Sequence, residues 1–361
     1  GIYEDKAIKN LYASEYIWNS IKDNKTVGII GEDKEKGLTY VAEPIGVICG
    51  VTPTTNPTST TIFKAMIAIK TGNPIIFAFH PSAQESSKRA AEVVLEAAMK
   101  AGAPKDIIQW IEVPSIEATK QLMNHKGIAL VLATGGSGMV KSAYSTGKPA
   151  LGVGPGNVPS YIEKTAHIKR AVNDIIGSKT FDNGMICASE QVVVIDKEIY
   201  KDVTNEFKAH QAYFVKKDEL QRLENAIMNE QKTGIKPDIV GKSAVEIAEL
   251  AGIPVLENTK LIIAEISGVG SDYPLSREKL SPVLALVKAQ STKQAFQICE
   301  DTLHFGGLGH TAVIHTEDET LQKDFGLRMK ACRVLVNTPS AVGGIGCLLY
   351  TSDAADEEDS V

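Results

Sequence analysis

The residue with the clearest chemical potential in this sequence is Cys187. It follows the polar run Lys179-Thr-Phe-Asp-Asn-Gly and precedes Ala-Ser-Glu-Gln. Such a segment predicts a loop that leads into a new element, where a thiol can be exposed and activated as a nucleophile. An inert thiol is the alternative, because cysteine also serves as a small apolar residue.

The spacing of the cysteines limits the other chemistry that they could do. Five cysteines lie at positions 49, 187, 299, 332 and 347. These intervals match neither a zinc motif nor a dense disulfide framework, so we expect free thiols in a reducing cytoplasm and no metal site.

A second candidate is Asn56, in the run Thr52-Pro-Thr-Thr-Asn-Pro-Thr-Ser-Thr60. The run follows an apolar, strand-like stretch, and α/β sheets place ligand sites where strands end. Asn56 precedes Pro57, which disfavours helical backbone, and its amide could donate to an oxyanion. A helix N-cap or turn asparagine is the alternative interpretation.

A third candidate is the glycine-rich turn in Leu132-Ala-Thr-Gly-Gly-Ser-Gly-Met-Val140. Its glycines let the backbone approach a phosphate, and the N-terminus of a following helix favours an anion. The run is not GxGxxG, so a plain tight turn is an equal alternative.

The elements that must position these residues alternate between strands and helices, and this rhythm predicts a mostly parallel α/β sheet covered on both faces. Helices are expected at 4–22, 58–71, 82–100, 167–178, 197–209, 217–230, 243–251, 292–302 and 319–331. Strands are expected at 45–51, 74–79, 107–111, 128–132, 191–196, 261–266, 283–288, 312–316 and 333–337.

Two stretches interrupt the rhythm. The Gly/Pro cluster at 152–159 predicts a domain junction. The stretch 347–361 continues no pattern and is similar to translated sequencing-adapter sequence, so we expect a non-native, unstructured tail; a natural acidic tail is the alternative. The first residue is Gly1 rather than Met, which suggests that the chain starts inside a longer protein.

Composition excludes several classes of function. The 361 residues are 43% hydrophobic and carry a net charge of −6. Negative charge would repel nucleic acids and anionic membranes, and no apolar run reaches the length of a membrane span. We therefore expect a cytoplasmic protein of two domains that binds neither nucleic acid nor membrane.

From residue 3 to 346 the chain resembles the aldehyde dehydrogenase half of the bifunctional aldehyde–alcohol dehydrogenases of fermenting bacteria. The resemblance is carried by Ala42-Glu-Pro-Ile-Gly, Pro53-Thr-Thr-Asn-Pro-Thr-Ser, Ala133-Thr-Gly-Gly, Gly152-Val-Gly-Pro-Gly-Asn, Lys179-Thr-Phe-Asp-Asn-Gly, Ile186-Cys-Ala-Ser-Glu-Gln, Glu278-Lys-Leu-Ser-Pro and Gly309-His-Thr. It implies an aldehyde dehydrogenase-like α/β fold. Residues 1–157 would be an N-terminally truncated, Rossmann-like NAD-binding domain, and residues 158–346 a catalytic domain.

The resemblance also implies a reaction. Cys187 would attack an aldehyde, Asn56 and the Cys187 N–H would hold the oxyanion, and hydride transfer to NAD would leave a thioester. Hydrolytic members carry a water-activating Glu in Glu-Leu-Gly-Gly, but the matching segment Gly152–Gly156 has no acid. Coenzyme A would therefore take the acyl group, so that acetaldehyde, CoA and NAD+ interconvert reversibly with acetyl-CoA and NADH.

The remaining site residues are also implied by the resemblance. Thr134, Gly135, Gly136 and Ser137 would bind the pyrophosphate, Gly154 and Pro155 the nicotinamide, and Glu278 the nicotinamide ribose. His80 stands where many members have a Lys at the adenosine ribose; this leaves NAD or NADP open, with NAD favoured. A solvated charge is the alternative for Glu278. His310 would orient CoA or help to transfer the thiol proton; a structural histidine that caps its glycine-rich turn is the alternative.

Three alternative hypotheses about function remain. The aldehyde could be propionaldehyde or succinate semialdehyde, or the chain could be an inactive fragment with only an assembly role. Family members form homo-oligomers or filaments. The iron-dependent alcohol dehydrogenase domain to which they are fused is missing here.

Overall fold

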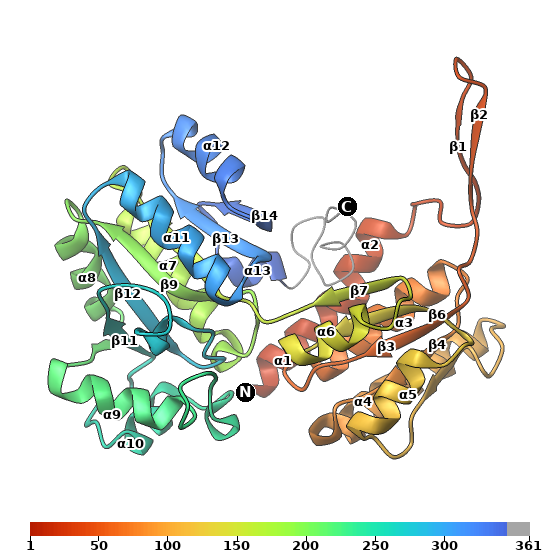
Figure 1. Ribbon diagram of the computed structural model, residues 1–361, viewed down its shortest axis with the longest axis horizontal. Coiled ribbons are helices and arrows are strands. Elements are labelled where there is room, and N and C mark those ends of the chain that lie inside the picture. Colours follow the sequence, from red (N-terminus) through yellow and green to blue (C-terminus); the bar gives the residue numbers. More distant parts are fainter. Residues whose placement is uncertain (345–361) are drawn as a thin grey trace. The chain divides into compact units, whose positions relative to one another are not determined.

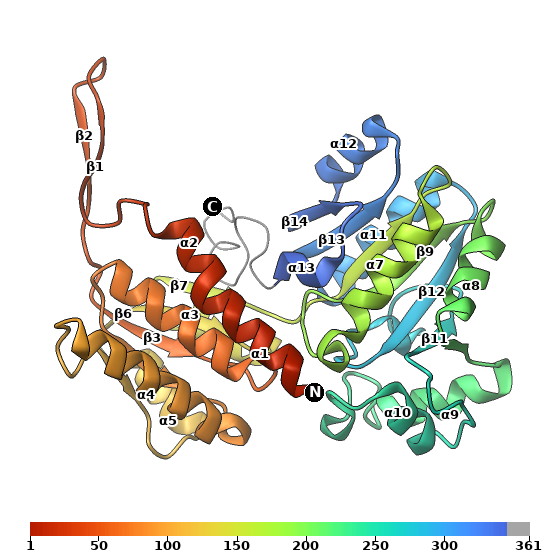
Figure 2. The same cartoon turned by 180° about the vertical axis from the view of Figure 1, so that it is seen from behind.

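A computed structural model describes residues 1–344, which divide into two compact units. We call residues 6–154 the first unit, and residues 155–344 together with residues 1–5 the second unit. Figures 1 and 2 show each unit as a sheet with helices on both faces. The predicted tail at 347–361, which includes Cys347, lies outside the described residues.

The first unit is built on a five-stranded parallel sheet in the order β5-β4-β3-β6-β7. Its strands are β3 (Val47–Val51), β4 (Ile75–Ala78), β5 (Ile108–Trp110), β6 (Ile128–Thr134) and β7 (Ala150–Val153). The chain runs outward from β3 to β5 and then returns to add β6 on the other side of β3. The carboxyl ends of β3 and β6 therefore form the switch point where α/β sheets bind ligands.

Helices cover both faces of this sheet because the side chains of its strands alternate in direction. Ile48 packs toward α3 (Pro57–Lys70) and α4 (Gln84–Lys100). Cys49 packs toward α5 (Ile116–Asn124) and α6 (Ser137–Tyr144). The helices and strands predicted between residues 45 and 134 are thus confirmed to within a few residues.

The N-terminal helical segment consists of α1 (Tyr3–Leu11), the π-helical turn η1 (Tyr12–Tyr16) and α2 (Ile17–Ile21). Its side chains Ala13 and Ile17 pack on Phe63 of α3. The sequence did not predict the antiparallel hairpin of β1 (Gly28–Asp33) and β2 (Leu38–Ala42), which projects from its unit in Figure 1.

The second unit holds a seven-stranded parallel sheet in the order β10-β11-β12-β9-β8-β13-β14. Its strands are β8 (Val158–Ile162), β9 (Glu190–Asp196), β10 (Ala212–Phe214), β11 (Leu261–Glu265), β12 (Val283–Ala289), β13 (Gly309–His315) and β14 (Ala331–Val336). Its helices are α7 (Ile168–Thr180), α8 (Tyr200–Ala209), α9 (Lys217–Ile227), α10 (Ala244–Leu250), α11 (Thr292–Gly306), α12 (Glu319–Arg328) and α13 (Ser340–Gly344).

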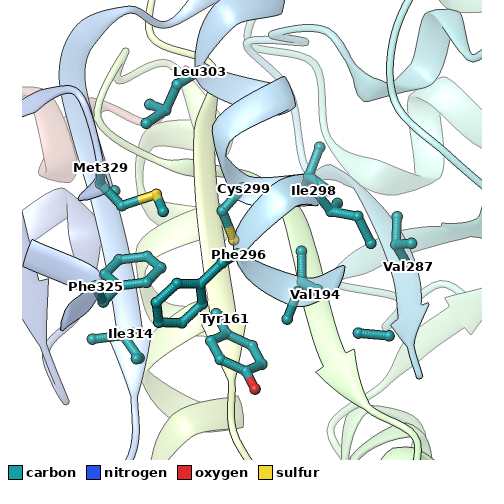
Figure 3. Packing of buried hydrophobic residues seen from close by; sticks show 14 of the residues in the cluster. Tyr161, Val194, Val287, Phe296, Ile298, Cys299, Leu303, Ile314, Phe325 and Met329 are labelled. Carbon is teal, nitrogen blue, oxygen red and sulfur yellow. The ribbon is translucent and has the colours of Figure 1, made fainter. Parts of the chain in front are cut away.

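An aromatic cluster anchors one face of this larger sheet (Figure 3). Phe296 of α11 contacts Tyr161 of β8 and Phe325 of α12 edge-on, with ring centroids 6.0 and 5.4 Å apart. The Tyr161 hydroxyl donates to Asp196 at 2.8 Å, which satisfies the polar end of a fully buried ring. Helices α7 and α8 pack on the opposite face.

The Gly/Pro cluster that predicted a junction contains the division between the units, which falls between Gly154 and Pro155. Strands β7 and β8 flank this point, and the sequence did not predict either of them, or the short β10. No helix among residues 1–344 is both long enough and apolar enough to cross a membrane.

Candidate functional site

The loop that carries Cys187 leads into β9, as the sequence predicted, and Cys187 itself is half-buried. The loop begins with the turn η3 (Phe181–Gly184), in which Asp182 and Asn183 have positive φ values of 50° and 53°. Left-handed backbone is costly for residues other than glycine and persists only where neighbours fix it.

Several contacts fix this left-handed turn. The Asp182 N–H donates to the Asp5 carboxylate at 2.7 Å, and the Asp182 carboxylate accepts from the Ile2 N–H at 2.8 Å. The Asn183 amide donates to the Gly241 carbonyl at 3.0 Å. The chain that leads to Cys187 is therefore held by two separate segments of the second unit, residues 1–5 and Gly241.

Gly156 brings the components of the cysteine site together. A Cβ at this position would lie 1.9 Å from the carbonyl oxygen of Cys187 and 3.2 Å from Cε1 of His310. The two backbones are thus in direct contact, and only glycine allows the approach. The Gly156 N–H also donates to Oε1 of Glu278 at 3.0 Å.

Glu278 is only partly exposed, which does not match the alternative of a solvated charge. Burial of its carboxyl group raises its pKa to about 7, against the opposing effects of the Gly156 N–H and of Lys179. The carboxyl group thus changes charge near neutral pH.

Two buried lysines support the segment that carries Glu278. The Lys279 ammonium donates to the carbonyls of Leu275, Arg277 and Gln191 at 2.7, 2.6 and 3.2 Å. The Lys179 ammonium donates to Oε1 of Gln191 at 2.9 Å, and the Lys279 N–H donates to the same oxygen at 3.1 Å. Burial lowers the pKa of Lys179 to about 7 and that of Lys279 well below its usual value.

A second carboxyl group, Glu190, lies at the start of β9. It is fully buried, and its Oε1 accepts from the Ser340 N–H at 3.0 Å, at the N-terminus of α13. The neighbouring Ala341 N–H donates to the Ser178 hydroxyl at 2.8 Å. Burial raises the pKa of Glu190 to about 7.

His310 lies at the start of β13, with 6% of its surface exposed. Its Nδ1 lies 2.9 Å from the Thr311 hydroxyl, and its backbone carbonyl accepts from the Cys332 thiol. Burial, helped by the positive charge of Arg333, lowers the pKa of His310 to about 3. The imidazole is therefore neutral at physiological pH and close to Gly156.

In the first unit, Asn56 occupies the N-cap position of α3, but its side chain makes no capping hydrogen bond. Its Oδ1 instead accepts from the Lys9 ammonium at 2.7 Å. The side chain of this asparagine is thus oriented by α1 rather than by the helix that it precedes.

The switch point between β3 and β6 is held by Lys64 of α3. This lysine is 2% exposed, and its ammonium donates to the carbonyls of Val51 and Leu132 and to the Thr134 hydroxyl, at 3.0, 3.0 and 2.7 Å. It therefore joins the strand end that leads to Asn56 with the strand end that leads to the glycine-rich turn.

The glycine-rich turn presents an open backbone to solvent. Gly136 is the N-cap of α6, both Gly136 and Ser137 are exposed, and a Cβ on Gly136 would meet no atom within 4 Å. The Gly135 N–H donates to Val153 at 3.1 Å, which fixes the turn on β7. A helix N-terminus of this kind has space for a phosphate group.

The structure thus groups the predicted residues within each unit. Cys187, Pro155, Glu278 and His310 lie around Gly156 in the second unit. In the first unit, Asn56 and the turn at 134–137 follow adjacent strand ends, and Gly154 is the last residue. His80 is exposed at the end of β4, where its Nδ1 accepts from the Ser82 N–H at 3.2 Å.

Sequence reasoning missed the buried polar residues that support these groups, namely Lys9, Lys64, Lys179, Glu190, Gln191 and Lys279. One signal for Lys64 was available, because it stands inside the apolar stretch Ile-Phe-Lys-Ala-Met of a buried helix. Across residues 1–344, no group of three His, Cys, Asp or Glu residues could hold a metal ion.

Comparison with known proteins places the chain in a family. Residues 6–345 match the Aldehyde dehydrogenase family, and the chain belongs to it. The chain is 56% identical to an aldehyde-alcohol dehydrogenase of Streptococcus pneumoniae over 96% of its own length and 40% of that relative. The chain therefore spans about 40% of the length of this curated relative.

Two solved structures are similar over most of their length. An acetylating aldehyde dehydrogenase from Geobacillus thermoglucosidasius is 46% identical, with a TM-score of 0.94, covering 100% of this chain and 81% of that one. A propionaldehyde dehydrogenase from Rhodopseudomonas palustris, solved with bound CoA and an acylated cysteine, is 32% identical, with a TM-score of 0.84 over 95% and 77%. The predicted aldehyde dehydrogenase-like α/β fold is thereby confirmed.

Proposed function

We propose that the chain is an acylating aldehyde dehydrogenase that converts acetaldehyde, CoA and NAD+ reversibly into acetyl-CoA and NADH. One observation supports this most directly: the segment Gly152–Gly156, whose Gly156 contacts the Cys187 carbonyl, carries no acid that could activate water. The names of its relatives, acetylating or aldehyde-alcohol dehydrogenases, point the same way.

The first half-reaction uses Cys187 and Asn56. The Cys187 thiolate attacks the aldehyde carbonyl, and the Asn56 amide and the Cys187 N–H stabilise the oxyanion of the thiohemiacetal. The chemistry that bound NAD+ would supply is acceptance of the hydride from the former aldehyde carbon, which would leave a thioester on the sulfur. Glu278, with Gly154 and Pro155, would hold the nicotinamide end, while residues 134–137 would hold the pyrophosphate and His80 the adenosine ribose.

The second half-reaction releases the acyl group to the thiol of CoA. General-base help to water is typically worth about 10²–10⁴-fold, so its loss favours a thiolate as the acceptor. Glu278 lies next to Gly156, but its Oε1 accepts a hydrogen bond from the Gly156 N–H. His310, which is neutral and close to Gly156, would orient the CoA thiol or help to transfer its proton.

The substrate, the setting and the partners belong to the same proposal. Acetaldehyde is favoured by the acetylating relative, whereas the R. palustris relative is named for propionaldehyde. A succinyl substrate would need a cation in the acyl pocket. We further propose a cytoplasmic homo-oligomer or filament, fused in the complete protein to an iron-dependent alcohol dehydrogenase domain.

The test uses this chain together with any flanking sequence that its gene encodes. Acetaldehyde and NAD+ should sustain NADH formation beyond a single turnover only when CoA is added. Acetyl-CoA should acetylate Cys187, which adds a mass of about 42 Da as a thioester. Cys187→Ser should abolish both signals.

The matched control is Cys332→Ser, since Cys332 is also half-buried and a serine hydroxyl can still donate to the His310 carbonyl. Thioester formation should persist in this variant. NADH formation at the same rate without CoA, or acylation that persists in Cys187→Ser, would refute the proposed function.

A further inference from the structure

Residues 6–10 of the N-terminal helical segment contact the end of the loop that carries Asn56, and the start of α3, at three successive points. The Lys6 ammonium donates to the Thr55 carbonyl, the Lys9 ammonium to Oδ1 of Asn56, and the Thr58 hydroxyl to Oδ1 of Asn10. Two of these contacts hold the loop without using the Asn56 side chain. The contact from Lys9 alone reaches the amide group itself.

An ammonium group can only donate hydrogen bonds, so it decides which end of an amide faces it. With Lys9 2.7 Å from Oδ1, the oxygen of Asn56 must point to α1 and the NH₂ group must point away from it. The other usual partner of an N-cap oxygen, a backbone N–H of the first helical turn, is not used here. The amide orientation is therefore set by Lys9.

Lys9 is buried, so its contact with Asn56 differs from that of a solvent-exposed lysine. The residue is only 4% exposed on α1, although lysine is almost never buried without a compensating partner. A cation on the carbonyl oxygen also withdraws electron density from the amide, which makes its N–H groups better donors. Both effects favour donation by Asn56 to a developing negative charge.

We propose that Lys9 is a positioning residue for the oxyanion donor: it fixes the Asn56 amide with its NH₂ group outward and polarises that group. This inference rests on the proposed function, in which Asn56 stabilises the thiohemiacetal oxyanion. Without Lys9 the amide could rotate and present its oxygen, which would repel the oxyanion rather than bind it.

The decisive experiment is a double-mutant cycle. It compares the rates of acyl-enzyme formation, which are measured from the NADH burst with acetaldehyde. Asn56→Ala should lower this rate by about 10²-fold, the usual effect of losing an oxyanion donor. Lys9→Met should lower it by about tenfold in the wild-type background and by nothing further in Asn56→Ala, because it acts through that side chain. The KM for NAD+ should change little.

Two further variants separate orientation from simple tethering. Lys6→Met removes the neighbouring lysine contact, which holds the Thr55 backbone, and should change the rate by less than about threefold. Asn56→Asp keeps an oxygen for Lys9 but removes both N–H donors, so it should be as slow as Asn56→Ala. If Lys9→Met does not fold, Lys9→Leu, which also has no donor for Oδ1, replaces it in the cycle with the same expectation.

The outcomes distinguish this inference from the proposed function. Equal losses from Lys6→Met and Lys9→Met, or a loss from Lys9→Met that persists in Asn56→Ala, would overturn the orienting role. An active Asn56→Ala enzyme would also overturn it while leaving the thioester chemistry intact. An active Cys187→Ser enzyme would instead remove the proposed function itself.

Discussion

The two units place their candidate site residues at opposite edges of their sheets. In the first unit, Asn56 and the glycine-rich turn follow the carboxyl ends of β3 and β6. In the second unit, Cys187, Glu278 and His310 lie where β9, β12 and β13 begin. The switch-point rule for open α/β sheets therefore finds the first group and misses the second.

The two edges are also stabilised differently. The carboxyl edge of the first unit depends on lysine side chains that donate to carbonyls, as Lys64 does. The amino edge of the second unit depends on close backbone contact at Gly156 and on buried charges of both signs. Loss of Lys64 should therefore lower the stability of the first unit, while a side chain at Gly156 should displace the cysteine.

The largest effect should come from Gly156→Ala. The added methyl group would overlap the Cys187 carbonyl, from which an ideal Cβ lies only 1.9 Å, and the cysteine must move. A displacement of about 1 Å can cost about 10²-fold in rate, so acyl-enzyme formation should fall at least that much. Gly177→Ala, where a Cβ meets nothing within 4 Å, is the control; equal rates for both variants would contradict the tight packing.

Next in size is Lys64→Met at the carboxyl edge. Removal of the ammonium leaves the Val51 and Leu132 carbonyls without this donor, so the free energy of unfolding of the first unit should fall by about 2–4 kcal/mol. Affinity for NAD+ should fall with it, because the same lysine holds Thr134. Urea unfolding and a fluorescence titration measure the two changes.

Lys148→Met is the matched comparison for Lys64, since its ammonium donates to the His125 and Ile128 carbonyls at the amino end of β6. It should cost only about 0.5–1.5 kcal/mol and leave NAD+ affinity unchanged. If the two variants lose the same free energy of unfolding and the same NAD+ affinity, the carboxyl edge is no more important to the first unit than the amino edge.

A smaller, pH-dependent effect is expected at Glu278. Its pKa is raised from 4.5 to about 7, so the carboxyl is mostly neutral below pH 7 and gains its charge as the pH rises above it. A carboxylate accepts hydrogen bonds from ribose hydroxyls more strongly, so NAD+ should bind about three- to tenfold more tightly at pH 8.5 than at pH 5.5. Glu278→Gln should remove this dependence, whereas Glu246→Gln, at the exposed N-terminal cap of α10, should keep it.

The smallest effect is expected from His310, on the way in which turnover depends on pH. With a pKa lowered to about 3, its imidazole stays neutral from pH 5 to 9 and contributes no titration there. His310→Asn should lower turnover by less than about tenfold and leave the shape of the profile unchanged. The contrary result would be a change in turnover near pH 6.5 that is present in the wild-type enzyme and absent in the variant. It would show that the histidine carries charge during the reaction.

Much of the fold followed from the sequence because apolar periodicity marks buried strands and helices. The hairpin of β1 and β2 escaped because its large apolar side chains, such as Ile29 and Val41, are exposed and give no core pattern. The strands β7 and β8 escaped because the Gly/Pro cluster between them dominated the local signal.

Some residues of the candidate site could likewise be predicted from the sequence, and others could not. The loop character of Cys187 could be predicted from polar and glycine residues, and the position of Asn56 from the strand before it. The buried lysines could not, because lysine is ordinarily a surface residue and only tertiary contacts show that Lys9 or Lys279 is enclosed. The roles of Glu278 and His310 needed the family resemblance, since their local sequences are common.

The packing around Gly152–Gly156 limits which positions of this segment could accept a new side chain. A side chain at Gly156 would overlap the Cys187 backbone, and one at Gly152 would lie 2.8 Å from Val140. A Cβ at Gly154 meets no atom within 4 Å. Of the three glycines, Gly154 alone leaves space for a side chain, so in the proposed reaction it is the position in this segment where a carboxylate could be added to activate water.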